Sequence, residues 1–171
     1  MNRTTVLSSL GLFVLVLASG CATAPRLTPM QIREISTREI EGTYENVYRA
    51  TMTVLQDNGY VITNTDMASG LIVATIDKET SGGSQFAQAL FIGHVADKAR
   101  VYEASCMVSK LNETRSDLRI NIQETKLGQS SSFSGTSRQG SKQIYDPTIY
   151  KTLFDSITIE VKRREAINPT P

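Results

Sequence analysis

Residues that commonly build reactive sites are scarce in this chain. Its 171 residues include no tryptophan, and His94 is the only histidine. A zinc site built on two histidines one helical turn apart is therefore excluded, and so is a Cys–His dyad within one turn. The lack of tryptophan also removes a residue that aromatic cages favour.

An excess of charge of either sign is also missing. The chain carries 18 Lys and Arg against 17 Asp and Glu, and its formal net charge at pH 7 is +1. A protein that binds nucleic acid needs a basic field to neutralise phosphates. The composition therefore argues against a nucleic-acid partner.

One long apolar run is present, at the N-terminus. Arg3 is the only charged side chain before Cys21, and a run rich in Leu and Val extends from Val6 to Ala18. A basic start, an apolar segment of about 7–15 residues and a small-residue cleavage site are typical of a secretory signal. The run is too short for a mature transmembrane helix. We therefore expect residues 1–20 to be a signal peptide.

The end of this run, LASGC (residues 17–21), resembles the lipobox of bacterial lipoproteins. The resemblance implies cleavage before Cys21 and a diacylglycerol on its sulfur, with acyl chains such as palmitate. Two or more chains attach a protein stably to a membrane. Ala22 stands where Asp would mark retention in the inner membrane, so the resemblance implies sorting to the outer membrane, on its periplasmic face.

The rest of the chain is expected to form one domain. Residues 21–32 contain Thr28 and Pro29 and are interpreted as a flexible tether, because such residues discourage regular structure. Residues 33–166 are numerous enough for a hydrophobic core, and residues 167–171 form a disordered tail. Once Cys21 is acylated, Cys106 has no disulfide partner.

Two amphipathic helices are predicted. Thr43 caps the first, which ends at Asp57 to Gly59. Asp146 caps the second, and Pro147 takes its first position. The apolar face of the first comprises Tyr44, Val47, Tyr48, Thr51, Val54 and Leu55, and that of the second Ile149, Tyr150, Leu153, Phe154, Ile157 and Val161.

Between the helices, the chain alternates in the manner of strands. The predicted strands are Tyr60–Asp66, Leu71–Asp77, Arg100–Leu111 and Leu118–Thr125, with weaker signals at Arg33–Glu41 and Lys142–Tyr145. The order is (β)αββ–insert–ββ(β)α. It predicts an α+β two-layer sandwich, with an antiparallel sheet of 4–6 strands and two helices on one face.

The stretch YENVYRATMTVLQDNGYVITNTDMASGLIVATIDKE, with DPTIYKTLFDSI near the end, resembles a group of small bacterial envelope lipoproteins of uncharacterised function. The order of elements is also similar to the helix-grip domains of the C subunit of the β-barrel assembly machinery. The shared residues occupy core and turn positions, so these resemblances imply a fold and no activity.

No catalytic, cofactor-binding or metal-binding residue is predicted. Cys106 falls on the apolar side of a strand, where a free cysteine acts as a small hydrophobic residue. His94 has Asp97 nearby in sequence but no nucleophile, and the serines around residues 130–134 lack the G-x-S-x-G elbow of a hydrolase. The pattern predicts a protein that is not an enzyme.

Two segments are candidate contact surfaces. The insert, residues 81–99, carries Phe86, Leu90, Phe91 and Ile92 near glycines, and Phe133 lies in a Ser/Gly-rich stretch. Apolar residues on loops often mark binding surfaces. The alternative is that each segment caps one end of the core.

Two functions follow as hypotheses. In the first, the protein is a lipid-anchored, non-catalytic subunit that contacts a protein partner in the envelope. In the second, it is a small-molecule or lipid-binding module with a pocket between the long helix and the sheet.

Overall fold

A computed structural model of the protein describes residues 27–77, 100–129 and 136–167. Within these residues it contains three helices and an antiparallel sheet of six strands, so the predicted α+β fold is confirmed. In chain order the elements are α2 (Pro29–Ser36), β1 (Thr37–Glu41), α3 (Tyr44–Asp57), β2 (Val61–Asp66), β3 (Leu71–Asp77), β4 (Arg100–Lys110), β5 (Arg115–Gln129), β6 (Thr136–Ile144) and α5 (Pro147–Ile167).

Helix α2 corrects the sequence prediction for residues 28–36. Thr28 and Pro29 were expected in a tether, and a strand was expected from Arg33. The structure instead has one helix from Pro29 to Ser36, with Thr28 as its N-cap. The Thr28 side chain accepts a hydrogen bond from the Gln31 N–H, and the Gln31 side chain accepts one from the Thr28 N–H. This capping box starts a helix in which Pro29 occupies the first position, where its missing N–H costs nothing.

Helix α3 begins and ends as its sequence predicts. Thr43 Oγ1 accepts a hydrogen bond from the Asn46 N–H at 3.3 Å. At the other end, the Gly59 and Tyr60 N–H groups donate to the carbonyls of Gln56 and Leu55. This pairing terminates a helix when the residue after the cap adopts a left-handed backbone, and Gly59 has φ of +86°.

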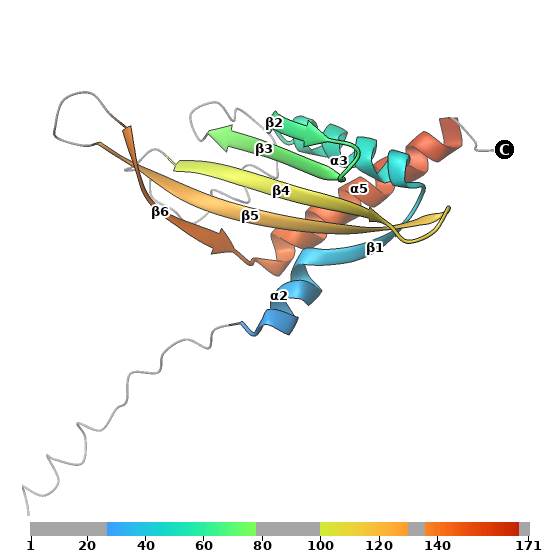
Figure 1. The fold of residues 1–171 in the computed structure, drawn as a ribbon, viewed down its shortest axis with the longest axis horizontal. Helices are drawn as coiled ribbons and strands as arrows, with labels where there is room; N and C mark the ends of the chain where they lie inside the picture. The colour runs from blue at the N-terminus through green and yellow to red at the C-terminus, as the bar shows by residue number, and fades with distance from the viewer. Residues whose placement is uncertain (1–26, 78–99, 130–135, 168–171) are drawn as a thin grey trace, which may run out of the picture.

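The sheet has the order β1-β5-β4-β3-β2, and β6 also pairs with β5. Strand β5 is long enough to carry two partners on one side. Its first residues pair with β1 (Thr37 opposite Arg119), and its later residues pair with β6 (Ile122 opposite Ile144). Strands β1 and β6 therefore share one side of β5, while β4 covers the other (Figure 1).

Helices α3 and α5 pack against each other on one face of the sheet (Figure 1). The six predicted α5 residues are all buried, as are the predicted inward-facing residues of β4 and β5. These strand residues are Tyr102, Ala104, Cys106, Val108, Leu118, Ile120 and Ile122. The core therefore lies between the two helices and the sheet, which confirms the predicted two-layer sandwich.

Candidate functional site

The predicted contact residues lie outside the described part of the chain. This holds for the lipidation site Cys21, for Phe86, Leu90, Phe91 and Ile92 of the insert, and for Phe133. The same is true of His94. Their roles remain predictions.

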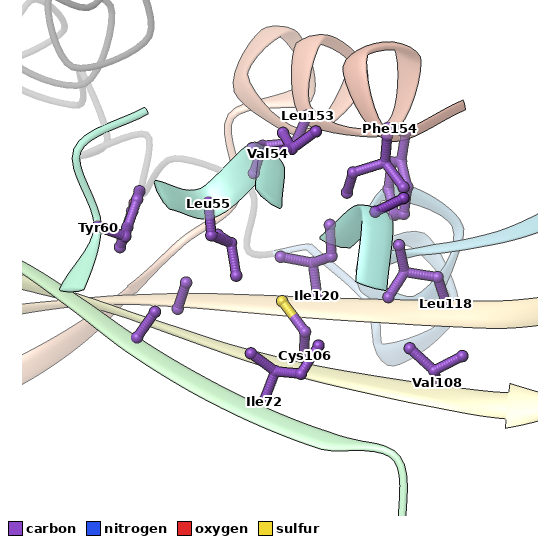
Figure 2. Packing of buried hydrophobic residues seen from close by; sticks show 14 of the residues in the cluster. Val54, Leu55, Tyr60, Ile72, Cys106, Val108, Leu118, Ile120, Leu153 and Phe154 are labelled. Atoms are coloured by element: carbon purple, nitrogen blue, oxygen red, sulfur yellow. The ribbon is translucent and has the colours of Figure 1, made fainter. Parts of the chain in front are cut away.

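Cys106 is fully buried in the core and carries a free thiol. Figure 2 shows its side chain pointing from β4 toward the helix layer, close to Ile72 and Ile120. Burial raises the pKa of the Cys106 thiol to about 12. Because the thiolate is the reactive form, Cys106 is inert at neutral pH and packs as a hydrophobic residue.

The aromatic residues of the helices are also structural. Tyr48, Tyr150 and Phe154 are buried, and the rings of Tyr44 and Tyr48 stack with centroids 6.2 Å apart. The Tyr44 hydroxyl donates to the Met67 carbonyl, and the Tyr48 hydroxyl donates to the Leu71 carbonyl at 3.1 Å. The two tyrosines therefore hold the turn between β2 and β3 against α3.

A groove lies where the sheet edge at β1 meets α5. It has a volume of about 570 Å³. Its lining residues are Arg38, Glu39, Ile40 and Glu41 of β1 and Asp155, Thr158, Ile159 and Lys162 of α5. The α5 members follow helical spacing and form a second stripe beside the buried one. Ile159 stands out in this stripe, because it is apolar and 69% exposed.

Charged side chains line one side of the groove. Arg38 donates to Asp155 Oδ1 at 3.0 Å, and Lys151 donates to Asp155 Oδ2 at 2.5 Å. The hydrogen bond from Lys151, together with Arg38, lowers the pKa of the Asp155 carboxyl. The Arg38 guanidinium also lies 4.7 Å from the centroid of the buried Phe154 ring. Arg38 is therefore held in place by two contacts from α5.

Acidic residues occupy the outer face of β1. Glu39 lies directly opposite Asp117 of β5, and Arg115 donates to Glu39 Oε1 at 2.7 Å. Burial raises the pKa of the Asp117 carboxyl, and the neighbouring Glu39 adds to the rise, while Arg33 opposes it. The described residues contain no ion pair that involves the exposed Glu41.

Two arginines near the end of α5 share one carboxylate. Arg163 and Arg164 both donate to Glu160, and Arg164 also donates to Thr53 Oγ1 at 2.8 Å. These hydrogen bonds, that of Arg163 foremost, lower the pKa of the Glu160 carboxyl. Arg164 therefore joins α5 to α3.

The described residues contain neither a cluster of metal-binding side chains nor a helix that could span a membrane. No group of three or more His, Cys, Asp or Glu side chains is arranged to hold a metal ion there. None of the helices in that part of the chain has the length and apolar character needed to cross a membrane.

Sequence reasoning missed the groove. The pattern Asp155, Thr158, Ile159 and Lys162 reads as an ordinary solvated helix face, and the short strand Thr37–Glu41 was hidden inside a longer, weakly alternating stretch. The one available signal was Ile159, an apolar residue off the main stripe. Only the pairing of β1 with β5, which makes β1 an edge strand, shows that Ile159 lies in a groove beside a sheet edge.

Comparison with known proteins assigns this chain to no family. No protein-family model matches the chain, and no curated protein matches it at a significant level. The resemblances drawn from LASGC and from the longer stretch therefore remain predictions.

Proposed function

We propose that this protein is a non-catalytic, lipid-anchored subunit of a bacterial envelope assembly. In this proposal, a diacylglycerol on Cys21 holds it on the periplasmic face of the outer membrane, and the groove between β1 and α5 receives a protein partner. The anchor is supported by the LASGC motif and by Ala22. Anchoring concentrates the domain at the membrane, so a modest groove affinity suffices.

The observation that carries the docking role is the exposed Ile159 in a groove beside an edge strand. An isolated exposed apolar residue is ordinary on a protein surface. Here it lies next to backbone groups at the sheet edge, and edge strands are ready templates for a further chain. The combination favours a protein partner over a diffusible substrate.

The anchor is tested by substitution of each cysteine. We expect the mature wild-type protein to carry acyl chains at Cys21 and to sediment with outer membranes. Cys21→Ser should abolish both properties, whereas Cys106→Ala should preserve them. Mass spectrometry of the N-terminal peptide and membrane fractionation give the readouts. An unmodified thiol on a freely soluble wild-type protein would refute the anchor.

The docking role is tested by site-specific photo-crosslinking in cells. A photoreactive amino acid at Ile159 should give one discrete adduct with another envelope protein. The matched control is Val61, which is 67% exposed at the opposite edge of the sheet. Recovery of the monomer alone at position 159, or of the same adducts at both positions, would contradict the proposal.

A small-molecule or lipid-binding module is the second candidate. The groove volume of about 570 Å³ falls within the range of about 300–1,000 Å³ that is usual for ligand sites. Native mass spectrometry of the purified protein should then reveal a co-purifying molecule that Ile159→Asp releases. Its absence from the wild type would exclude this candidate.

A further inference from the structure

The outer edge of β1 is open within the described residues. Strand β1 pairs with β5, and no other described strand lies beside it. Just past β1, the Gly42 N–H donates to the Thr114 carbonyl at 2.7 Å in the same register. Since hydrogen-bonded pairs alternate along an antiparallel ladder, Arg38 and Ile40 direct their backbone groups toward β5.

The alternate residues of β1 consequently direct their backbone groups away from the sheet. These residues are Thr37, Glu39 and Glu41. The parity along β5 agrees, because the Ile122 N–H points to this same side, where it meets the Tyr150 hydroxyl at 3.2 Å. Thr37 is also the C-cap of α2, so Glu39 and Glu41 are the residues that offer a donor and an acceptor at this edge.

Helix α5 lines the groove beside this edge. Its stripe of Asp155, Thr158, Ile159 and Lys162 faces the groove beside β1, where the sheet has no described strand to cover it. A further strand along β1 would lie over this stripe and bury Ile159.

The opposite edge of the sheet differs in regularity. Strand β2 is interrupted by a β-bulge between Ile62 and Asn64. Bulges twist an edge and disrupt pairing, and proteins use them to block the addition of a strand. The register of β1 with β5 runs without a shift from Thr37 to Glu41. Strand β6, which among the described strands pairs only with β5, is a third edge, and its register with β5 shifts between Thr125 and Lys126. Of the three edge strands, β1 is therefore the one with an unbroken register that suits the addition of a strand.

We propose that an extended segment of another polypeptide adds to the β1 edge as a further antiparallel strand and fills the groove. This inference rests on the proposed function and specifies how the partner is captured. The added strand places alternate basic side chains beside Glu39 and Glu41 on the outer face of the sheet. Its other face carries apolar side chains that cover Ile159.

Charge decides against a second copy of this chain as the occupant. Two β1 strands paired about a twofold axis set Glu39 opposite Glu39 in one register and opposite Glu41 in another. Like charges directly opposite one another destabilise strand pairing, whereas opposite charges contribute about 0.2–1 kcal/mol per pair. A segment with Lys or Arg at alternate positions meets the same surface favourably.

The test uses the full-length lipoprotein in detergent micelles and two synthetic peptides. One alternates lysine and valine over eight residues, and the other alternates glutamate and valine. We expect the lysine peptide to bind and the glutamate peptide to bind at least about fivefold more weakly, from two or more reversed cross-strand pairs. Glu41→Lys should reduce or reverse the preference for the lysine peptide over the glutamate peptide. Equal binding of both peptides, or no binding of either, overturns the proposal.

Hydrogen exchange at single amides distinguishes strand addition from loose electrostatic binding. With the lysine peptide bound, the Glu39 and Glu41 amides should exchange at least tenfold more slowly. The Arg38 and Ile40 amides, which already face β5, should change little. Methylation of the lysine backbone nitrogens, which face β1 in antiparallel addition, should abolish binding, and methylation of the valine nitrogens should not. Equal slowing of all four amides would overturn the proposal.

A side-chain pair provides a matched control. Ile159→Ser should weaken the binding of the lysine peptide about tenfold. The loss of about 55 Å² of apolar surface buried at the interface corresponds to that factor. Val61→Ser, at the bulged edge, should leave its affinity unchanged. If crosslinking from Ile159 captures a partner while the Glu39 and Glu41 amides remain unprotected in that complex, the proposed function stands and strand addition fails.

Discussion

The Tyr150 hydroxyl accepts a hydrogen bond from the Ile122 N–H at 3.2 Å, and it donates one to the Ile144 carbonyl at 2.9 Å. Ile122 and Ile144 are opposite each other in the pair of the β5–β6 ladder at the C-terminal end of β6. A side chain of α5 is thus inserted between the backbones of two strands. The Tyr150 hydroxyl therefore bridges the two strand backbones where β6 ends, and it holds α5 against the sheet.

Removal of this hydroxyl should weaken the whole domain. Tyr150→Phe leaves the buried Ile122 N–H without its partner, and we expect a loss of about 1–3 kcal/mol in the free energy of unfolding. Urea denaturation measures the loss, and hydrogen exchange at the Ile122 amide should accelerate. Tyr48→Phe is the control, because its hydroxyl makes one hydrogen bond, to the Leu71 carbonyl. A smaller effect at Tyr150 than at Tyr48 would contradict this account.

Gly70 is expected to tolerate no side chain. Its φ is +81°, and a Cβ at this position would lie 2.0 Å from the Val108 carbonyl oxygen. Gly70→Ala should therefore destabilise the protein by about 2–4 kcal/mol, from backbone strain and overpacking together. The matched control is Gly140→Ala. Gly140 also has a positive φ, of +69°, but a Cβ there meets no atom of the described residues within 4 Å.

The control isolates the steric part of the effect. Gly140→Ala should cost only the backbone term of about 1–2 kcal/mol. Chemical denaturation of the two variants side by side gives the comparison. Equal losses in the free energy of unfolding of the two variants would mean that the close approach of Gly70 to β4 does not contribute to the destabilisation.

The ion pair between Arg100 and Glu124 joins β4 to β5 at the end of the core. The side chains are only 17% and 8% exposed, respectively. Arg100→Met should cost about 3–5 kcal/mol, because it leaves the Glu124 carboxylate buried without a counterion. The double variant Arg100→Met/Glu124→Leu should recover most of that loss. A double-mutant cycle by urea denaturation tests this, and simple additivity would contradict it.

Stability should fall at alkaline pH. Burial raises the pKa values of Cys106 and Tyr150 to about 12, and it also raises that of Tyr60. A folded-state pKa above the unfolded value gives stability that is complete below the unfolded pKa and is lost as pH rises through the folded one. The decline should begin near pH 9 with the thiol and steepen from pH 10 with the tyrosines.

A single substitution separates these contributions. Cys106→Val removes the thiol and should flatten the stability profile between about pH 9 and 10, while the decline above pH 10 persists. Denaturation midpoints in urea from pH 7.5 to 11.5 provide the measurement. A wild-type profile that stays level to pH 11 would show that the buried groups do not resist ionisation.

Much of the fold could be predicted from local signals. The helix caps at Thr43 and Asp146 and the apolar stripe from Ile149 to Val161 depend on residues close in sequence. The alternation in β4 and β5 identified their inward faces for the same reason. The start of α2 was missed because Thr28 and Pro29 were interpreted as breakers, although both residue types are common at the first turn of a helix.

The sequence by itself determined the two-layer arrangement, because periods of 3.6 and 2 residues specify which side of each element is apolar. It also determined the motif that suggests a lipid anchor. Only the tertiary structure decided that β1 and β6 share one side of β5 and that Ile159 lies beside an open edge. The pairing of β1 with β5 joins residues more than 70 positions apart, such as Glu39 and Arg115, and no local pattern encodes which strands become neighbours.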